Sequence, residues 1–80
     1  MTIIPVQYKQ FRYHGTMLTV PYDTKWLAID PTGCVVAFYS EPEVCGNDWH
    51  QDNALAVVGC VIEPISNWHD SAIPTTQAAE

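Results

Sequence analysis

Basic residues are the scarcest part of this sequence. Its 80 residues include only 3 Lys and Arg against 9 Asp and Glu, so the formal net charge is −6. No Lys or Arg follows Lys25, and residues 41–80 carry a net charge of −7 whereas residues 1–40 carry +1. A protein that binds nucleic acid directly needs a positive surface patch to replace the counterions of the phosphates. The charge pattern therefore argues against direct nucleic-acid binding.

One short segment points the other way. Residues 8–14 interleave Lys9 and Arg12 with aromatic side chains, a pattern typical of surfaces that bind nucleic acid. Two cations are few for that role, and the field of the whole acidic protein opposes it. We interpret the segment as an edge strand with one aromatic face and one polar face.

Long apolar runs are also missing. No window approaches the roughly 20 apolar residues that a helix needs to cross a bilayer, so we expect no membrane partner. Residues 1–5 lack the basic region and the apolar stretch of a signal peptide. We therefore expect a cytoplasmic protein.

Cysteine is present in an odd number, which makes a poor disulfide framework. Without an export signal, we expect all three thiols to be reduced. Cys34 and Cys60 stand in apolar runs and are predicted to be core residues, which leaves Cys45 as the exposed one. Two Cys and two His can bind zinc, but Cys45 with His50 and Cys60 with His69 have the wrong spacing for zinc knuckles. We expect no bound metal and no other cofactor.

The clearest local signal is a β-hairpin over residues 26–39. Residues 26–29 and 34–39 are rich in apolar, β-branched and aromatic side chains and are predicted to be antiparallel strands. Between them, the sequence Asp-Pro-Thr-Gly of residues 30–33 fits the four places of a type I turn.

Other segments complete a mainly β chain. Further strands are expected at residues 16–20 and 54–62, and a helical turn is expected at residues 68–72. The predicted fold is a small antiparallel sheet of three to four strands, as a meander or half-barrel, with at most one short helical turn near the C-terminus. Residues 1–74 are predicted to form one domain, and residues 75–80 a disordered tail. The predicted core contains Leu27, Ile29, Val36, Phe38, Val58, Cys60 and Ile62, with Trp26, Trp49 and Trp68 partly buried.

No catalytic signature is present. Nucleophilic catalysis needs a Ser or Cys beside a base, and the serines stand near turns without a Gly-x-Ser-x-Gly elbow. The loop of residues 47–52 combines Asp and His, which could serve acid–base chemistry or bind a hard cation, but it lacks the pattern of a calcium loop. We interpret it as a solvated acidic loop pinned by Trp49, and we expect a protein that is not an enzyme.

The run of residues 26–42 carries a resemblance. Its order of Trp26, Ala28, Asp30, Gly33 and Val35 is similar to small uncharacterised phage proteins that read Trp-x-Ala-x-Asp-x-x-Gly-x-Val. Those proteins often close with a Trp-x-x-Ser segment, which residues 68–71 resemble. The resemblance implies an accessory phage gene product that acts in the host cytoplasm and brings no catalytic residues.

Small acidic products of such genes commonly bind and disable a host machine. We therefore expect a protein that blocks a host protein without catalysis, either a defence complex such as CRISPR or an enzyme that binds nucleic acid. The alternative is a structural or assembly component of a virion or homo-oligomer, in which strand edges pair between copies. The predicted binding residues are Glu41, Glu43, Asp48, Trp49, Asp52 and Asp70, with Trp49 as the apolar anchor among acids.

Overall fold

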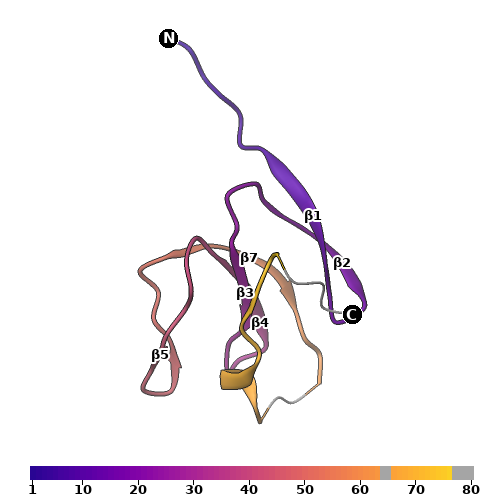
Figure 1. The fold of residues 1–80 in the computed structure, drawn as a ribbon, viewed down its shortest axis with the longest axis vertical. Coiled ribbons are helices and arrows are strands. Elements are labelled where there is room, and N and C mark those ends of the chain that lie inside the picture. Colours follow the sequence, from indigo (N-terminus) through magenta and orange to yellow (C-terminus); the bar gives the residue numbers. More distant parts are fainter. Residues whose placement is uncertain (64–65, 77–80) are drawn as a thin grey trace.

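The predicted hairpin is the centre of the computed structural model, which describes residues 1–63 and 66–76 of the chain. Strands β3 (Trp26–Ile29) and β4 (Cys34–Phe38) pair antiparallel (Figure 1). In the turn, the Gly33 N–H donates to the Asp30 carbonyl at 3.0 Å, and Gly33 has a φ of 95°, where glycine is favoured. The carboxylate Oδ1 of Asp30 accepts from the N–H of Thr32 and the N–H of Cys34, both at 2.9 Å. The turn is therefore held by the Asp side chain that the sequence placed first in it.

Two more strands complete a four-stranded antiparallel sheet in the order β7-β4-β3-β8. Strand β7 (Ala54–Cys60) pairs with β4, so the apolar run 54–62 forms a strand rather than a helix, although the strand ends two residues early. The register shifts twice along this pair, and the shift between Val35 and Val36 places Gly59 beside a bulge. On the other side, β8 (Ile73–Pro74) pairs with β3, and its proline is tolerated because β8 is an edge strand.

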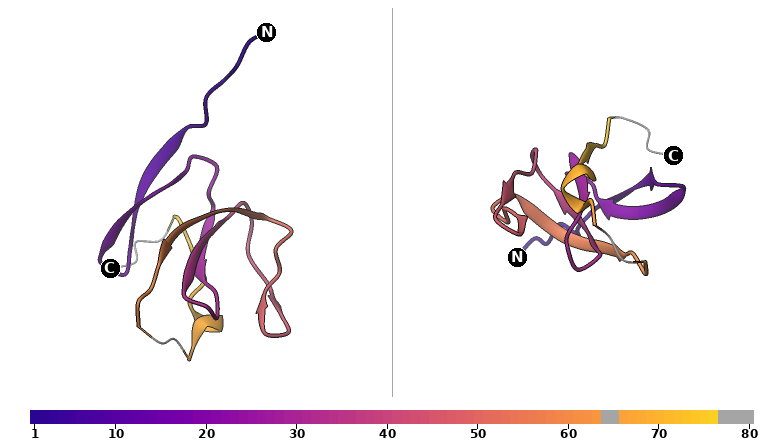
Figure 2. Two further views of the ribbon diagram at one scale, coloured as in Figure 1. Left: turned by 180° about the vertical axis from the view of Figure 1, so that it is seen from behind. Right: turned by 90° about the horizontal axis from the view of Figure 1, so that it is seen from below.

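The first two strands form a separate two-stranded ribbon. Strand β1 (Tyr8–Tyr13) pairs with β2 (Thr16–Pro21) across a tight turn at His14 and Gly15, both at positive φ. The ribbon packs on the sheet through Phe11 and Leu18. Residues 1–7 run straight away from the body, as two views agree (Figures 1 and 2).

The remaining elements are short. Strands β5 (Val44–Cys45) and β6 (Asp48–Trp49) form a small hairpin, and η1 (Trp68–Asp70) is a single 3-10 turn. The prediction of a mainly β chain with a small antiparallel sheet of three to four strands and at most one short helical turn near the C-terminus is therefore confirmed, and the described residues add two two-stranded sheets to it. Within residues 1–63 and 66–76, no helix is long and apolar enough to span a membrane.

The predicted tail begins with an attached residue. The N–H of Thr75 donates to the Lys25 carbonyl at 2.8 Å, which extends the β3–β8 pairing by one bond. The rest of the predicted tail includes residues 77–80, which lie outside the described residues.

The core lies on both faces of the central hairpin. One cluster gathers Tyr13, Val20, Leu27, Ile29, Val35 and Ala37, and the other Ala28, Val36, Phe38 and Trp49. Leu27, Ile29, Val36 and Phe38 are buried as predicted, and Trp26 and Trp68 are partly buried as predicted.

Four core predictions need correction or refinement. Ile62 is 92% exposed and Cys60 is exposed, so neither belongs to the core. Cys60 is the last residue of the edge strand β7 and Ile62 lies beyond it, so no further strand covers either side chain. Val58 is only partly buried, while Trp49 is only 4% exposed and is therefore a core residue rather than a half-exposed one.

Candidate functional site

A polar groove lies where the chain leaves β4 and where it enters β7. Its volume is about 410 Å³, and three predicted binding residues line it, namely Glu41, Glu43 and Asp52. His50 also lines this groove. We call these four residues the acidic groove. The groove brings together side chains from two segments that are seven or more residues apart in sequence.

Backbone hydrogen bonds join the two segments that form the groove. The Tyr39 N–H donates to the Asn53 carbonyl at 2.8 Å, and the His50 N–H donates to the Glu43 carbonyl at 2.7 Å. Between these bonds, β5 and β6 add the pairing of Val44 with Trp49. The carboxylates therefore project from a fixed backbone and not from a free loop.

Trp49 anchors the segment that carries His50 and Asp52 to the core. Its indole Nε1–H donates to the Ile29 carbonyl at 2.8 Å in a buried position. Its ring makes edge-to-face contacts with Phe38 and Trp68, with centroids 6.5 and 5.6 Å apart. The predicted role of a partly buried Trp49 as an apolar anchor for a partner is thereby replaced by a structural one, because its side chain is only 4% exposed.

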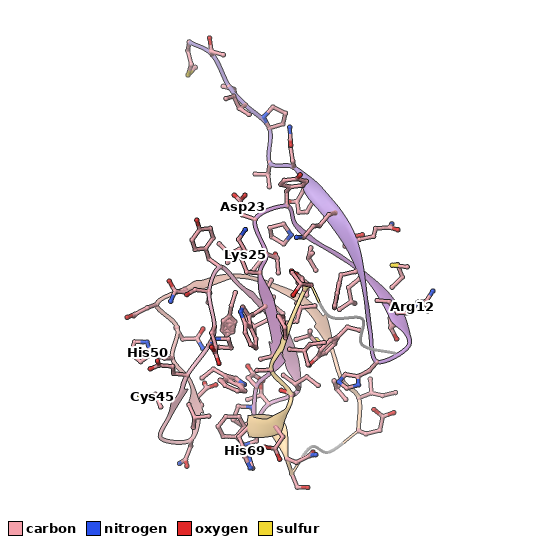
Figure 3. The ribbon with its side chains drawn as sticks, viewed as in Figure 1. Arg12, Asp23, Lys25, Cys45, His50 and His69 are labelled. Atoms are coloured by element: carbon pink, nitrogen blue, oxygen red, sulfur yellow. The ribbon has the colours of Figure 1, made fainter. Side chains whose placement is uncertain are left out.

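The charge of the groove is not balanced by fixed cations. Within the described residues, no Lys or Arg comes within 4 Å of a carboxylate, and the one ion pair in the groove joins His50 Nδ1 to Asp52 Oδ2 at 3.4 Å. Arg12 lies on the ribbon, on the other side of the molecule from His50 (Figure 3). Among the described residues, His50 is therefore the only basic side chain paired with a carboxylate of the groove, and the negative field of the groove extends into solvent.

Two other predicted acids lie outside the groove. Asp48 is exposed in β6. Its Oδ1 accepts from the Trp49 N–H at 2.7 Å, so the carboxylate is already used in a local hydrogen bond. Asp70 is in η1, 3.8 Å from His69 Nε2, and borders a different cavity. Of the five predicted acids, the structure therefore brings three into one groove and places Asp48 and Asp70 on other elements.

A second hollow, which sequence reasoning missed, lies between the ribbon and the sheet. Its volume is about 690 Å³, and Tyr13, Leu18, Ile29 and Val35 are among the residues that line it. The Tyr13 hydroxyl donates to the Ser71 carbonyl at 2.8 Å, and burial raises the pKa of Tyr13 to about 12. Tyr13 is thus a protonated donor already in use, and its position depends on a contact 58 residues away that no local pattern predicts.

Among the described residues, the structure contains no cluster suited to zinc. No group of three or more His, Cys, Asp or Glu side chains in that part of the chain is placed to hold a metal ion. Cys45 and His50 lie together on one side of the molecule, whereas His69 lies on η1 (Figure 3). Cys60 is exposed on β7, which corrects the expectation that Cys45 is the one exposed cysteine.

Comparison with known proteins gives no relative from which to transfer a role. No family model matches the chain, and no curated protein and no solved structure is significantly similar to it.

Proposed function

We propose that this chain is a non-catalytic interaction protein whose acidic groove docks on a basic surface of a host protein and blocks it. The observation that carries the proposal is the set of carboxylates of Glu41, Glu43 and Asp52, which have no Lys or Arg partner among the described residues and are held by a hydrogen-bonded backbone. The resemblance of residues 26–42 to phage proteins is what favours a host partner. A defence complex such as CRISPR or another nucleic-acid-binding enzyme offers the required Lys and Arg.

The physical argument is one of charge complementarity. Lys and Arg side chains that normally hold phosphates can accept carboxylates instead, and the long-range field of a −6 protein speeds their encounter. Exposed ion pairs add little affinity by themselves, so apolar contacts must slow dissociation. Because Trp49 is buried, the exposed side chains beside the groove, Tyr39 and Val44, are the apolar contacts that we assign to this role.

The test compares two variants with the same change in net charge. The groove variant carries Glu41→Gln, Glu43→Gln and Asp52→Asn, and the control carries Asp23→Asn, Glu63→Gln and Asp70→Asn, all exposed acids outside the groove. The partner is first captured from host lysate at low salt and identified, and association rates are then measured at two salt concentrations.

We expect the groove variant to associate about tenfold more slowly than the parent and to lose most of its salt dependence. The control should keep a rate within about twofold to threefold of the parent, since its remaining field is still focused at the groove. Equal slowing in both variants would show that only net charge matters. An unchanged rate in the groove variant would overturn the proposal.

A second candidate function rests on a different observation. Residues 1–7 extend from the body and expose the apolar side chains of Ile3, Ile4 and Val6, at 75%, 81% and 68%. An exposed apolar segment of this kind suits pairing between copies, as in an assembly component. Light scattering on the full chain and on an Ile4→Ser, Val6→Ser variant distinguishes the two, because only an assembly held by this segment becomes monomeric on substitution.

A further inference from the structure

Two of the three cysteines face each other across the sheet. In the register of β4 and β7, Cys34 is the direct partner of Cys60. One residue beyond this pair, where both strands have ended, the Val61 N–H donates to the Gly33 carbonyl at 2.7 Å. Hydrogen-bonded and non-hydrogen-bonded pairs alternate in an antiparallel ladder, so Cys34 and Cys60 form a non-hydrogen-bonded pair.

This kind of pair has the geometry that a disulfide needs. Opposite residues at such positions have Cα atoms about 4.5 Å apart and side chains that leave the same face of the sheet. Disulfides join residues whose Cα atoms are about 4.4 to 6.8 Å apart, so no strand has to move far to form the bond. The pair also lies at the end of the β4–β7 ladder, next to the register shift at Val35 and Val36, where the backbone can adjust.

Both thiols are free in this structure, and one is open to solvent. Cys60 is exposed and Cys34 is partly buried. The Cys34 sulfur contacts Thr32 Oγ1 at 3.5 Å, while the Thr32 hydroxyl donates to Asp30 Oδ1 at 2.7 Å. Because the single hydroxyl hydrogen is taken by the carboxylate, the Cys34 S–H is the donor in the longer contact. A contact of this length is weak, so little is lost when it breaks and the Cys34 sulfur bonds to another group.

We propose that Cys34 and Cys60 form a cross-strand disulfide when the protein meets a small-molecule disulfide such as oxidised glutathione. The Cys60 thiolate attacks one glutathione sulfur, the glutathione S–S bond breaks, and one reduced glutathione leaves. The Cys34 thiolate then attacks the Cys60 sulfur of the mixed disulfide and displaces the second reduced glutathione. Two protein thiols are oxidised by two electrons, and one glutathione disulfide is reduced to two thiols.

The third cysteine has no such partner. Cys45 is paired with Asp48 in the β5–β6 hairpin, so its thiol has no cysteine opposite it. When Cys45 reacts with oxidised glutathione, the product is a mixed disulfide that has no second cysteine to resolve it. An odd cysteine count, which argues against a disulfide framework, is therefore compatible with one bond and one spare thiol.

The bond would fasten the edge strand to the inner hairpin. It closes the chain segment from residue 34 to residue 60, which contains the whole acidic groove and the β5–β6 hairpin. Closing a loop of this length restricts the unfolded chain and raises the melting temperature of the oxidised form. We expect a rise of at least about 5 °C for a chain of this size.

The experiment uses the full chain with Cys45→Ser, a substitution at an exposed position that leaves the pair intact. The native variant is incubated with oxidised glutathione and its intact mass is read without reductant. We expect the loss of two hydrogen atoms and no glutathione adduct, with reversal by dithiothreitol. Proteolytic mapping should place the bond between Cys34 and Cys60.

Single variants provide the controls. Adding Cys34→Ser to the Cys45→Ser background should leave one glutathione on Cys60 and abolish the loss of two hydrogens. The proposal is overturned when the Cys45→Ser protein, still folded by circular dichroism, accumulates glutathione adducts without losing two hydrogens. A melting temperature that falls on oxidation would also contradict it, because it would mean that the bond strains the sheet.

Discussion

Strands β4 and β7 are both composed mainly of apolar residues, but they differ in how deeply those residues are buried. Cys-Val-Val-Ala-Phe in β4 is buried at four of five positions, whereas Ala-Leu-Ala-Val-Val-Gly-Cys in β7 has no fully buried residue. The difference lies in the strand order β7-β4-β3-β8, because β4 has a neighbour on each side and clusters on both faces. Burial in this sheet therefore follows position in the order more closely than apolar content.

The strongest test of the comparison is a pair of truncations, one on each strand. Phe38 in β4 is fully buried, so Phe38→Ala should lower the free energy of unfolding by about 3–5 kcal/mol. Val57 in β7 is 61% exposed, and Val57→Ala should change it by less than about 0.5 kcal/mol. Chemical denaturation monitored by tryptophan fluorescence measures both. Similar losses in the two variants would break the comparison.

The turn of the inner hairpin provides the next largest effect. The Asp30 carboxylate accepts from two N–H groups and from the Thr32 hydroxyl, so Asp30→Ala leaves several donors without a partner. We expect a loss of about 1–3 kcal/mol in the free energy of unfolding. Asp30→Asn keeps an oxygen acceptor and should recover at least half of that loss. If Asn proves as damaging as Ala, charge rather than hydrogen bonding holds the turn.

Tyr13 covers one face of the inner hairpin and makes its stability depend on pH. Its pKa is about 12 in the folded chain against 10 in the unfolded chain, so the folded state binds the proton more tightly. The resulting stability is complete below pH 10 and is lost as pH rises from 10 to 12. Tyr13→Phe should remove this loss, and at pH 7 it should cost about 1 kcal/mol because the Ser71 carbonyl loses its donor.

Denaturation curves at pH 9 and pH 11 measure the effect. Tyr22→Phe, at a position that is 61% exposed, is the matched control and should leave the alkaline loss unchanged. A Tyr13→Phe protein that loses stability between these pH values as steeply as the parent would contradict the assignment.

The smallest expected effect is a gain in the free energy of unfolding. Thr24, just before β3, is fully buried, and its Oγ1 has no hydrogen-bond partner within the described part of the chain. Replacing the buried hydroxyl with a methyl group of similar size in Thr24→Val should raise the free energy of unfolding by about 0.5–1 kcal/mol. Thr19→Val, at an exposed position of β2, should change it by a few tenths at most. A loss at Thr24 would reveal a hydrogen bond that the buried hydroxyl makes in solution.

Local patterns predicted the parts of this fold that depend on neighbours in sequence. The turn at Asp30 and the two strands beside it are confirmed because the turn chemistry and the apolar runs act within a few residues. The predictions that Trp49 is only partly buried and that Cys60 and Ile62 belong to the core were wrong, because burial at these positions depends on which strand lies next to which. The carboxylates of the groove could be named from sequence, but their convergence with His50 depends on the bond from His50 to Glu43.

The place of β8 in the sheet has a consequence for how the chain folds. Trp26 is paired with Pro74, 48 residues further along, so the central strand β3 acquires its second neighbour only after nearly all of the described chain has been synthesised. Until then β3 presents a bare edge, and such unpaired edges invite contact with other nascent chains. Long-range pairing of this kind also slows folding, because the loop must close before any bond is gained. The two-residue strand β8 therefore determines when this edge of β3 is covered, although it supplies only two pairs of residues.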